Sequence, residues 1–205
     1  MTTTATRSTA FLSIKQWGIP LTLALVAILV AASGQDATLA LRYQRPSIID
    51  GQLWRIVTGN LVHLGWQHLV MNVIGLMLIW ALLKDVYSQL PWIAIISISG
   101  LGVSLGLLTL TPEIHWYVGL SGLLHGMFLA GVIGNLRRRE WRDALLLAAV
   151  VAKLAYEQIA GAVPGSAEFA NGPVVVDAHL YGAIAGALCA AVFRPRAPSH
   201  HIRSG

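Results

Sequence analysis

The sequence predicts an all-α membrane protein, a bundle of six transmembrane helices with both termini in the cytoplasm. Two observations predict this class. First, 56% of the 205 residues are hydrophobic and only 11% are charged, whereas soluble domains are roughly 25% charged. Second, the chain contains six apolar runs of 16 to 21 residues, some of them slightly short of the length of about 20 residues that is typical of helices that span a bilayer. The length suits one domain, so we expect a single transmembrane domain over residues 1–205.

The apolar runs define the expected helices. They cover residues 17–32, 67–83, 90–110, 118–136, 144–160 and 178–193. The first run ends in small residues, as a signal peptide does, but five further runs follow it, so we interpret it as an uncleaved helix. Residues 1–16 are then a cytoplasmic segment, and residues 195–205 are a cytoplasmic tail that we expect to be disordered. The single cysteine, Cys189, has no partner for an intrachain disulfide and is predicted to pack between helices.

Charge placement predicts the orientation of these helices. With a cytoplasmic N-terminus, only Arg42, Arg45 and Arg55 lie on the opposite side. Basic residues concentrate in cytoplasmic loops, and topology together with attraction to anionic lipid explains the net charge of +5 without a nucleic-acid partner. The cytoplasmic set comprises Arg7, Lys15, Lys84, Arg137, Arg138, Arg139, Arg142, Arg194, Arg196 and Arg203.

Polar side chains gather at the outer ends of the predicted helices. His63 lies in the first outer loop, His68 and Asn72 lie at the outer end of the second run, and Ser121 and His179 lie at the outer ends of the fourth and sixth. Polar residues inside a membrane are costly and by default indicate function. Their convergence on one side of the bilayer therefore predicts a site there.

The spacing around Ser121 indicates its chemistry. The segment 119–122 reads GLSG, which predicts a serine at or near a helix N-terminus, where free N–H groups and the positive end of the helix dipole stabilise an anion. An acyl-transfer enzyme needs such donors beside its nucleophile. His68 and Asn72 are four residues apart and share one helix face.

Small residues predict which helices meet. Gly122 and Gly126 on the fourth run face a matching series on the sixth run, Ala178, Gly182 and Gly186. Faces of this kind let membrane helices approach closely. Such an approach brings Ser121 and His179 within hydrogen-bond reach. Because no acidic residue accompanies them at that depth, we expect a Ser–His dyad.

These motifs together resemble the rhomboid family of intramembrane serine proteases. The matching segments are GLSG at 119–122, AHLYGAIAG at 178–186, HLGWQHLVMN at 63–72 and the Trp54-Arg55 pair. The corresponding family patterns are GxSG, AHxxGxxxG, a histidine-rich run ending in HxxxN, and a Trp-Arg pair in the first outer loop. GxSG alone is a weak signal, but the resemblance extends over residues 52–190 with the motifs in the same order.

The resemblance implies a role for each matched position. Ser121 would be the nucleophile, and His179 would be its general base and then the acid that protonates the leaving amine. The Ser121 N–H, Asn72 and His68 would form the oxyanion hole, supported by Gly119. The Trp54-Arg55 pair would brace the outer loop. The implied setting is the bacterial inner membrane, with an active site open to the outer face, a transmembrane-anchored protein substrate, no metal and no cofactor.

One position departs from the common family pattern. His125 stands four residues after Ser121, where many rhomboid proteases carry an aromatic residue that stacks on the base histidine. The segment GLSGLLHG, together with Lys153, Glu157 and Gln158, resembles the rhombosortase subgroup, whose substrates end in a Gly-Gly motif, one transmembrane helix and a basic terminus. His125 then either orients His179 or takes an indispensable catalytic part. Lys153 and Glu157, four residues apart, are expected to form a buried ion pair with a structural role or a role in substrate recognition.

Several alternatives stay open at this stage. Ser121 and His179 are also compatible with packing roles, and His68 and Asn72 with an interhelical polar clamp. A general rhomboid protease of other single-pass substrates is one functional alternative. A non-catalytic rhomboid-like protein that binds membrane clients is another, although such proteins typically lack the serine or the histidine. The sequence has no HExxH pattern and no carboxylates that match the histidines at the outer face, which argues against a zinc protease. It also shows no evident inverted repeat, which argues against a transporter.

Overall fold

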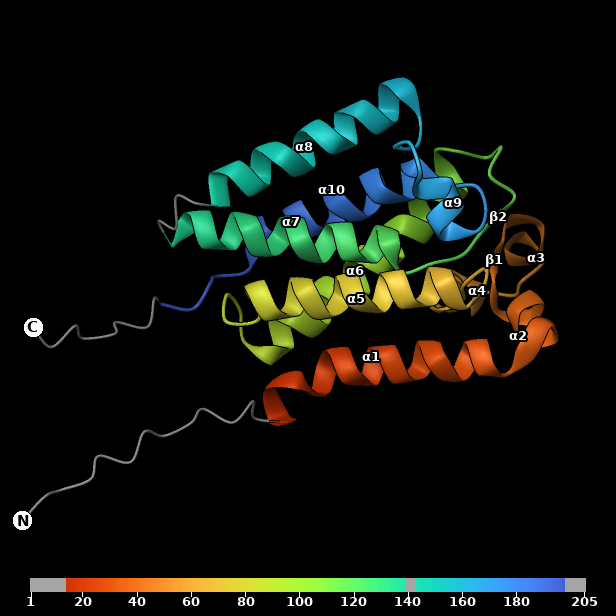
Figure 1. Ribbon diagram of the computed structural model, residues 1–205, viewed down its shortest axis with the longest axis horizontal. Helices are drawn as coiled ribbons and strands as arrows, with labels where there is room; N and C mark the ends of the chain where they lie inside the picture. Colours follow the sequence, from red (N-terminus) through yellow and green to blue (C-terminus); the bar gives the residue numbers. More distant parts are fainter. Residues whose placement is uncertain (1–13, 139–142, 198–205) are drawn as a thin grey trace, which may run out of the picture.

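The computed structural model describes residues 14–138 and 143–197, and most of these residues are helical. Each of the six predicted runs forms a long helix, and these helices lie side by side in Figure 1. They are α1 (Ile14–Ala32), α5 (Trp66–Leu83), α6 (Gln89–Thr109), α7 (Ser121–Arg137), α8 (Asp143–Ala160) and α10 (Val176–Val192). The start of α1 and the end of α10 lie at the same end of the bundle.

The lengths of these helices bear on how many cross a membrane. Among the described residues, α5 and α6 are long and apolar enough to span one by length and composition. A third candidate is α1 joined to α2 (Gly34–Leu41), although the two helices are bent by 118°. The bend falls at Gly34, whose φ of +88° lies in the left-handed region that glycine tolerates. Two or three candidate spans are therefore evident by this measure, fewer than the six predicted.

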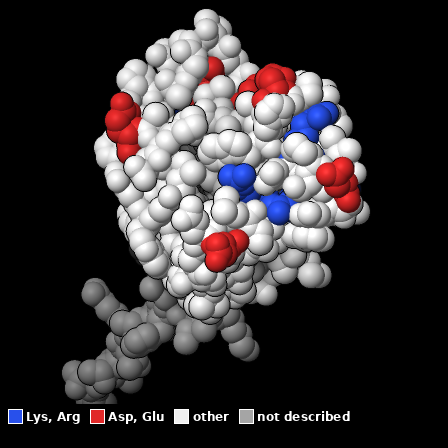
Figure 2. Space-filling model, turned by 90° about the vertical axis from the view of Figure 1, so that its right-hand side faces the viewer, with Lys and Arg blue, Asp and Glu red and all other residues white. Residues whose placement is uncertain are grey.

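Short elements gather at the end of the bundle opposite to the start of α1 and the end of α10 (Figure 1). The strands β1 (Tyr43–Gln44) and β2 (Trp116–Tyr117) pair antiparallel, with Tyr43 opposite Tyr117. The remaining short elements are α3 (Arg45–Ile49), α4 (Arg55–Thr58), the 3-10 helix η1 (Gly59–Leu61) and α9 (Ser166–Ala170). Figure 2 looks onto this end, where charged side chains of both signs are scattered without a continuous basic patch.

The Trp54-Arg55 pair ties the start of α4 to the end of α2. The Arg55 guanidinium donates to the carbonyl oxygens of Leu39 and Arg42, both at 2.9 Å. The Trp54 indole N–H donates to the Ala40 carbonyl at 3.3 Å. The last carbonyls of a helix have no partner within that helix, so the pair caps the end of α2. This arrangement fits the bracing role that the resemblance implies.

The start of α7 differs from the predicted boundary. The run 118–136 was expected to be helical throughout, but the helix begins at Ser121. Gly119 interrupts it, because its φ of +122° is not helical. The Tyr117 hydroxyl donates to the Gly119 carbonyl at 2.7 Å, and burial raises the pKa of Tyr117 to about 12, which keeps this donor protonated. The prediction that Ser121 lies at a helix N-terminus is confirmed.

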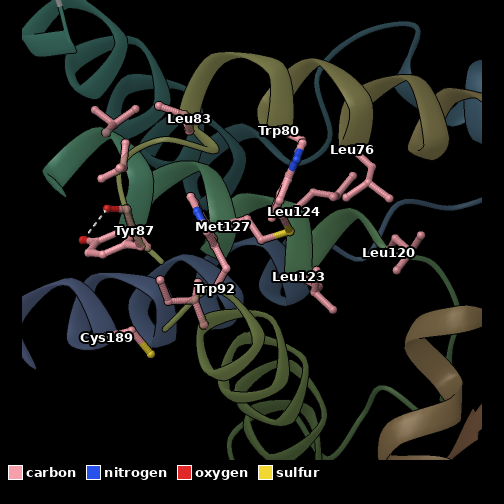
Figure 3. Packing of buried hydrophobic residues seen from close by; sticks show 14 of the residues in the cluster. Leu76, Trp80, Leu83, Tyr87, Trp92, Leu120, Leu123, Leu124, Met127 and Cys189 are labelled. Atoms are coloured by element: carbon pink, nitrogen blue, oxygen red, sulfur yellow. Dashed lines mark hydrogen bonds between the residues drawn. The ribbon is translucent and has the colours of Figure 1, made fainter. Parts of the chain in front are cut away.

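The centre of the bundle is α7, which packs against α5, α6, α8 and α10. Around it lies a core of large apolar side chains, shown in Figure 3. The buried Tyr87 hydroxyl has a hydrogen-bond partner in this core, because it donates to the Ala130 carbonyl at 3.1 Å. Cys189 is buried in the same core, as predicted. The labelled residues of this core are Leu76, Trp80, Leu83, Tyr87, Trp92, Leu120, Leu123, Leu124, Met127 and Cys189.

The predicted small-residue contact between α7 and α10 is confirmed. A Cβ atom added at Gly122 would lie 2.6 Å from the Ala178 carbonyl oxygen. A Cβ atom at Gly182 or Gly186 would collide with the carbonyl oxygen of Gly122 or Gly126, respectively. The two backbones therefore touch along more than two helical turns, and this contact holds the outer ends of α7 and α10 together.

Large apolar side chains cover the outward faces of the long helices. In a bilayer these faces meet lipid tails, which are as apolar as leucine, and the chain accordingly has the surface of a membrane protein. Examples with more than half of the side chain exposed are Leu25, Leu29, Leu78, Leu82, Leu188 and Val192.

Parts of two sequence predictions lie outside the described residues. The expected N-terminal segment 1–16 is described only from Ile14, where α1 already begins, three residues before the predicted start of the first helix. The expected tail 195–205 is described only to residue 197, and within it the Arg196 N–H donates to the Val86 carbonyl at 2.7 Å. Arg7, Arg139, Arg142 and Arg203 of the cytoplasmic charge set also lie outside the described residues.

The backbone contact between α7 and α10 yields a stability prediction. We expect Gly182→Ala to lower the free energy of unfolding by about 1–3 kcal/mol, because the added methyl group has no room beside the Gly122 carbonyl. The measurement is thermal unfolding in detergent micelles. Gly18→Ala on α1 is the matched control, since no atom lies within 4 Å of a Cβ there. Equal effects of the two substitutions would contradict the close contact.

Candidate active site

Ser121 and His179 meet at the outer end of the α7–α10 contact. Ser121 is the first residue of α7, and His179 lies in the first turn of α10. The Ser121 Oγ and the His179 Nε2 are 3.0 Å apart, although 58 residues separate them in the chain. His179 is buried, with 5% of its surface exposed. The structure thus brings together the two residues that the small-residue faces predicted to meet.

Ser121 lies where two cavities adjoin. The first has a volume of about 280 Å³ and is lined by Ser121, His179 and His68, and by Ser166 and Phe169 of α9. The second has a volume of about 420 Å³ and lies between α5, α7 and α8, with mostly apolar side chains around it. Both cavities are lined by Asn72, Ser121 and His125. Ser121 therefore borders both cavities.

Hydrogen-bond donors surround the serine. The Leu64 N–H donates to the His68 Nδ1 at 3.5 Å, so the proton of a neutral His68 is on Nε2. That nitrogen packs against the backbone before Ser121, since a Cβ atom at Gly119 would lie 3.0 Å from it. Asn72 donates one amide proton to the His68 carbonyl at 3.1 Å and keeps a second. The first N–H groups of α7 have no partner within the helix, so these donors suit an anion beside Ser121.

His63 supports this arrangement from outside the cavity. Its ring meets the His68 ring edge-on, with 5.0 Å between centroids. Burial lowers the pKa of His63 to about 3, so the ring is neutral. His63 therefore braces His68 by packing, which agrees with the loop-bracing interpretation.

The structure corrects the expectation that no acidic residue accompanies the Ser–His pair. The Glu157 carboxylate oxygens lie 2.9 and 3.1 Å from the His179 Nδ1, and only 1% of this side chain is exposed. Glu157 lies near the end of α8, on the side that faces α10. The spacing of Lys153 and Glu157 predicted an ion pair on one face of α8. The apolar pattern of α8 does not indicate that this face turns toward His179.

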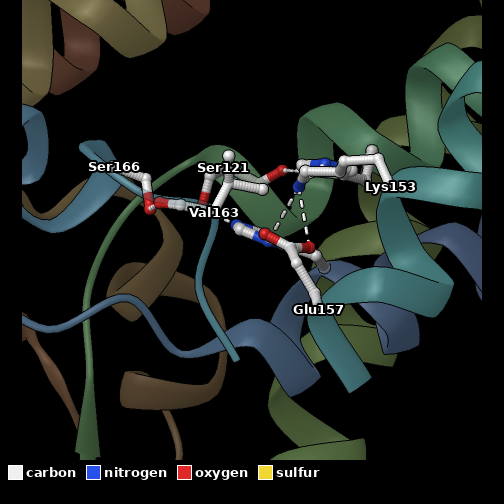
Figure 4. A network of polar contacts seen from close by, with 7 residues as sticks. Ser121, Lys153, Glu157, Val163 and Ser166 are labelled. Carbon is white, nitrogen blue, oxygen red and sulfur yellow. Dashed lines mark hydrogen bonds and ion pairs between the residues drawn. The ribbon is translucent and has the colours of Figure 1, made fainter. Parts of the chain in front are cut away.

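Lys153 joins this cluster from the same helix (Figure 4). Its Nζ lies 2.8 Å from the Glu157 Oε2, so the predicted ion pair is confirmed. The same Nζ lies 2.7 Å from the His125 Nε2 and 3.2 Å from the His179 Nδ1. The ion pair is therefore part of the site and not a separate feature of α8.

His125 stacks on His179, as the position of the family's aromatic residue led us to expect. The two ring centroids are 4.2 Å apart and the planes are inclined by 22°. The His125 Nδ1 lies 2.7 Å from the carbonyl oxygen of Ser121. His125 thus contacts both the backbone of Ser121 and the ring of His179.

The same cluster bears on metal binding. His125, Glu157 and His179 offer three possible ligand atoms within 4.8 Å of one another, so a carboxylate does accompany the histidines, contrary to the sequence argument. However, the Lys153 Nζ lies within 3.2 Å of an atom of each of the three. The ammonium group supplies the positive charge at the place where a cation would bind.

The fold and the site define a helical membrane protein in which a serine, three histidines and an ion pair converge at one end of the bundle. The Rhomboid domain model matches residues 50–196, and the chain belongs to the rhomboid family. A protein of Bacillus subtilis (strain 168) named "Putative rhomboid protease YdcA" is 28% identical over 141 residues, which cover 69% of this chain and 67% of that protein. The family predicted from the motifs is confirmed, and both findings support protease activity.

The geometry at Gly119 yields a prediction about the site's construction. We expect Gly119→Ala to destabilise the protein by about 1–3 kcal/mol, because alanine resists a φ of +122° and its Cβ would lie 2.9 Å from the His68 Cε1. Gly51→Ala is the control for backbone strain alone, since Gly51 has a φ of +99° and open space around its Cβ position. Thermal unfolding of both variants measures the difference. If Gly119→Ala costs no more than Gly51→Ala, His68 does not pack tightly on this loop.

Proposed function

We propose that the protein is an intramembrane serine endopeptidase in which Ser121 is the nucleophile and His179 is the general base. The observation that carries this proposal is the 3.0 Å contact between the Ser121 Oγ and the His179 Nε2. The Ser121 hydroxyl donates to that nitrogen, which takes the proton as Oγ attacks the scissile carbonyl carbon. An acyl-enzyme forms when the tetrahedral intermediate collapses and His179 returns the proton to the leaving amine.

The oxyanion of that intermediate requires donors on the side of α7. The Ser121 N–H at the start of α7, the His68 Nε2–H and the second Asn72 amide proton supply them, with Gly119 keeping the approach open. Removal of one such donor in other hydrolases costs about 10²–10³ in kcat. Water entering from the outer face then attacks the acyl-enzyme, and His179 again acts as the base.

The proposal places all six long helices across the membrane. Both termini would then lie in the cytoplasm, and Ser121 would open toward the outer face of a bacterial inner membrane. The charge bias of the sequence and the exposed leucines of the long helices support this arrangement. The whole chain, residues 1–205, would form one transmembrane domain, with no cofactor and with lipid as its surroundings.

The proposed substrates are exported proteins with a C-terminal Gly-Gly motif, one transmembrane helix and a basic end. The segment GLSGLLHG and the Lys153–Glu157 pair support this rhombosortase-type specificity. A helical peptide bond is internally hydrogen-bonded, and a membrane segment must unwind locally before Ser121 can attack it. Glycine favours unwinding, because it weakens a helix by about 1 kcal/mol per residue relative to alanine.

The mechanism predicts that Ser121→Ala and His179→Ala each abolish cleavage, because one removes the nucleophile and the other removes its base. The measurement is release of a co-expressed membrane-anchored reporter, together with labelling by a fluorophosphonate probe. Ser166→Ala is the matched control, since Ser166 lines the same cavity but donates to the Val163 carbonyl. Full cleavage by both site variants, verified as folded, would falsify the serine mechanism.

The proposed specificity predicts that the Gly-Gly motif of the reporter governs cleavage. Replacing both glycines by alanine removes about 2 kcal/mol of helix weakening, so we expect cleavage to slow by about 30-fold. The assay compares the two reporters in the same membranes. Equal cleavage of both would indicate a general rhomboid protease, whereas no cleavage and no probe labelling of the wild type would indicate a client-binding protein.

A further inference from the structure

We propose that Glu157 is a positioning residue for His179, and that Lys153 is its charge partner and the anchor of His125. The inference rests on the proposed function, because it assigns these residues a part in the reaction of Ser121. It replaces the expected Ser–His dyad with a hydrogen-bonded network drawn from α7, α8 and α10. Every member of this network lies within 3.2 Å of another.

The contact between Glu157 and His179 determines which nitrogen of the imidazole carries the proton. An ionised carboxylate only accepts hydrogen bonds, so at 2.9 Å from its oxygen the His179 Nδ1 must be the donor. The Nε2 of the neutral ring is then unprotonated and presents its lone pair to the Ser121 Oγ. This tautomer is the one that a general base requires. Glu157 therefore prepares His179 for proton transfer before a substrate arrives.

The same carboxylate faces His179 when the ring becomes charged. After His179 takes the Ser121 proton, both ring nitrogens carry hydrogen, and the imidazolium lies against a carboxylate that is almost completely buried. Opposite charges attract more strongly where water is excluded. Glu157 thus acts through His179, and it is not among the residues that line the two cavities beside Ser121.

Lys153 determines the state of His125 by the same reasoning. An ammonium group only donates, so the His125 Nε2, at 2.7 Å, must be an acceptor. The proton of neutral His125 is then on Nδ1, where it donates to the Ser121 carbonyl at 2.7 Å. His125 is held at both ends, with its ring stacked on His179. The Lys153 Nζ and the His179 Nδ1 lie 3.2 Å apart. Both are donors, and they share the Glu157 carboxylate as their acceptor.

Lys153 also allows the carboxylate to stay ionised. A buried charge without a partner is costly, and the Lys153 ammonium at 2.8 Å compensates the charge of Glu157. The lysine side chain is about one-third exposed, at 32%, and borders the second cavity. Before the reaction the network therefore offers the Glu157 carboxylate as an acceptor for the His179 N–H, while the charges of Lys153 and Glu157 cancel.

The competing interpretation is that Lys153 and Glu157 form a structural ion pair that fastens α8 to α10. A structural pair changes the amount of folded protein but leaves the turnover of each folded molecule unchanged. A positioning pair lowers kcat in protein that is folded, while KM changes little because Glu157 lines neither of the two cavities beside Ser121. The rate at which a fluorophosphonate acylates Ser121 separates the two interpretations as well, since it needs the base but no transmembrane substrate.

The experiment compares Glu157→Gln with Asp143→Asn in liposomes containing the full-length protein and the Gly-Gly reporter. We expect Glu157→Gln to lower kcat and the probe-labelling rate by about 100-fold or more, since an amide no longer enforces the Nδ1–H tautomer. We expect KM to stay within about threefold. Glu157→Asp keeps the charge and should recover part of the lost rate. Asp143 is a buried carboxylate on the same helix, about 21 Å from Glu157 along its axis, and Asp143→Asn should leave kcat unchanged.

A second variant covers the case in which Glu157→Gln fails to fold, because that change leaves the Lys153 charge without its partner. The double variant Lys153→Met and Glu157→Gln removes both charges, and we expect the same loss of kcat in its folded fraction. Wild-type kcat in either folded variant overturns the inference. So does loss of folding in both variants while Asp143→Asn stays folded, which would mark the pair as structural. Failure of the proposed function is distinct, since it would appear as cleavage retained by Ser121→Ala.

Discussion

The direct backbone contact between α7 and α10 is the constraint on which the rest of the structure depends. At Gly122, Gly182 and Gly186 there is no space for a side chain, because each Cα faces a carbonyl or backbone atom of the other helix. Lipid tails offer no hydrophobic drive for helices to associate, so close packing of small residues takes its place. The contact begins one residue after Ser121 and holds the first turn of α10 beside it. The 3.0 Å separation between Ser121 and His179 is a direct result of this packing.

A second constraint is that polar groups inside an apolar bundle must satisfy one another. Glu157 is almost fully buried and contacts both Lys153 and His179, while His125 bridges Lys153 and the Ser121 carbonyl. In a membrane each unsatisfied group would cost several kcal/mol, which favours one arrangement of these side chains over its alternatives. The same contacts that remove this cost also orient the His179 ring toward Ser121. Stability and the proposed chemistry therefore draw on one set of hydrogen bonds.

The short elements lie at the end of the bundle where α7 begins, beside the cavity that Ser121 lines. The β1–β2 pair carries the chain past Tyr117 to Gly119, where the backbone turns into α7. His68 packs against that turn, and His63 packs against His68. Arg55 ties the preceding loop to α2 through two backbone carbonyls. The turn leads from the β1–β2 pair to Ser121, which lines the same cavity as His68 and Asn72.

The sequence by itself determined the features that depend on local pattern. Hydropathy located the six long helices, the glycines at 122 and 182 indicated which two would touch, and the GLSG segment placed Ser121 at a helix N-terminus. The motifs also identified the family. Only the tertiary structure decided that Glu157 and Lys153 belong to the site, because a largely apolar helix such as α8 carries little amphipathic pattern to show which face turns inward. That rotation is set by packing against α7 and α10, between residues far apart in the chain. The first three residues of the apolar run 118–136 are likewise not helical, because β1 pairs with β2 and the chain turns at Gly119, and hydropathy records neither feature.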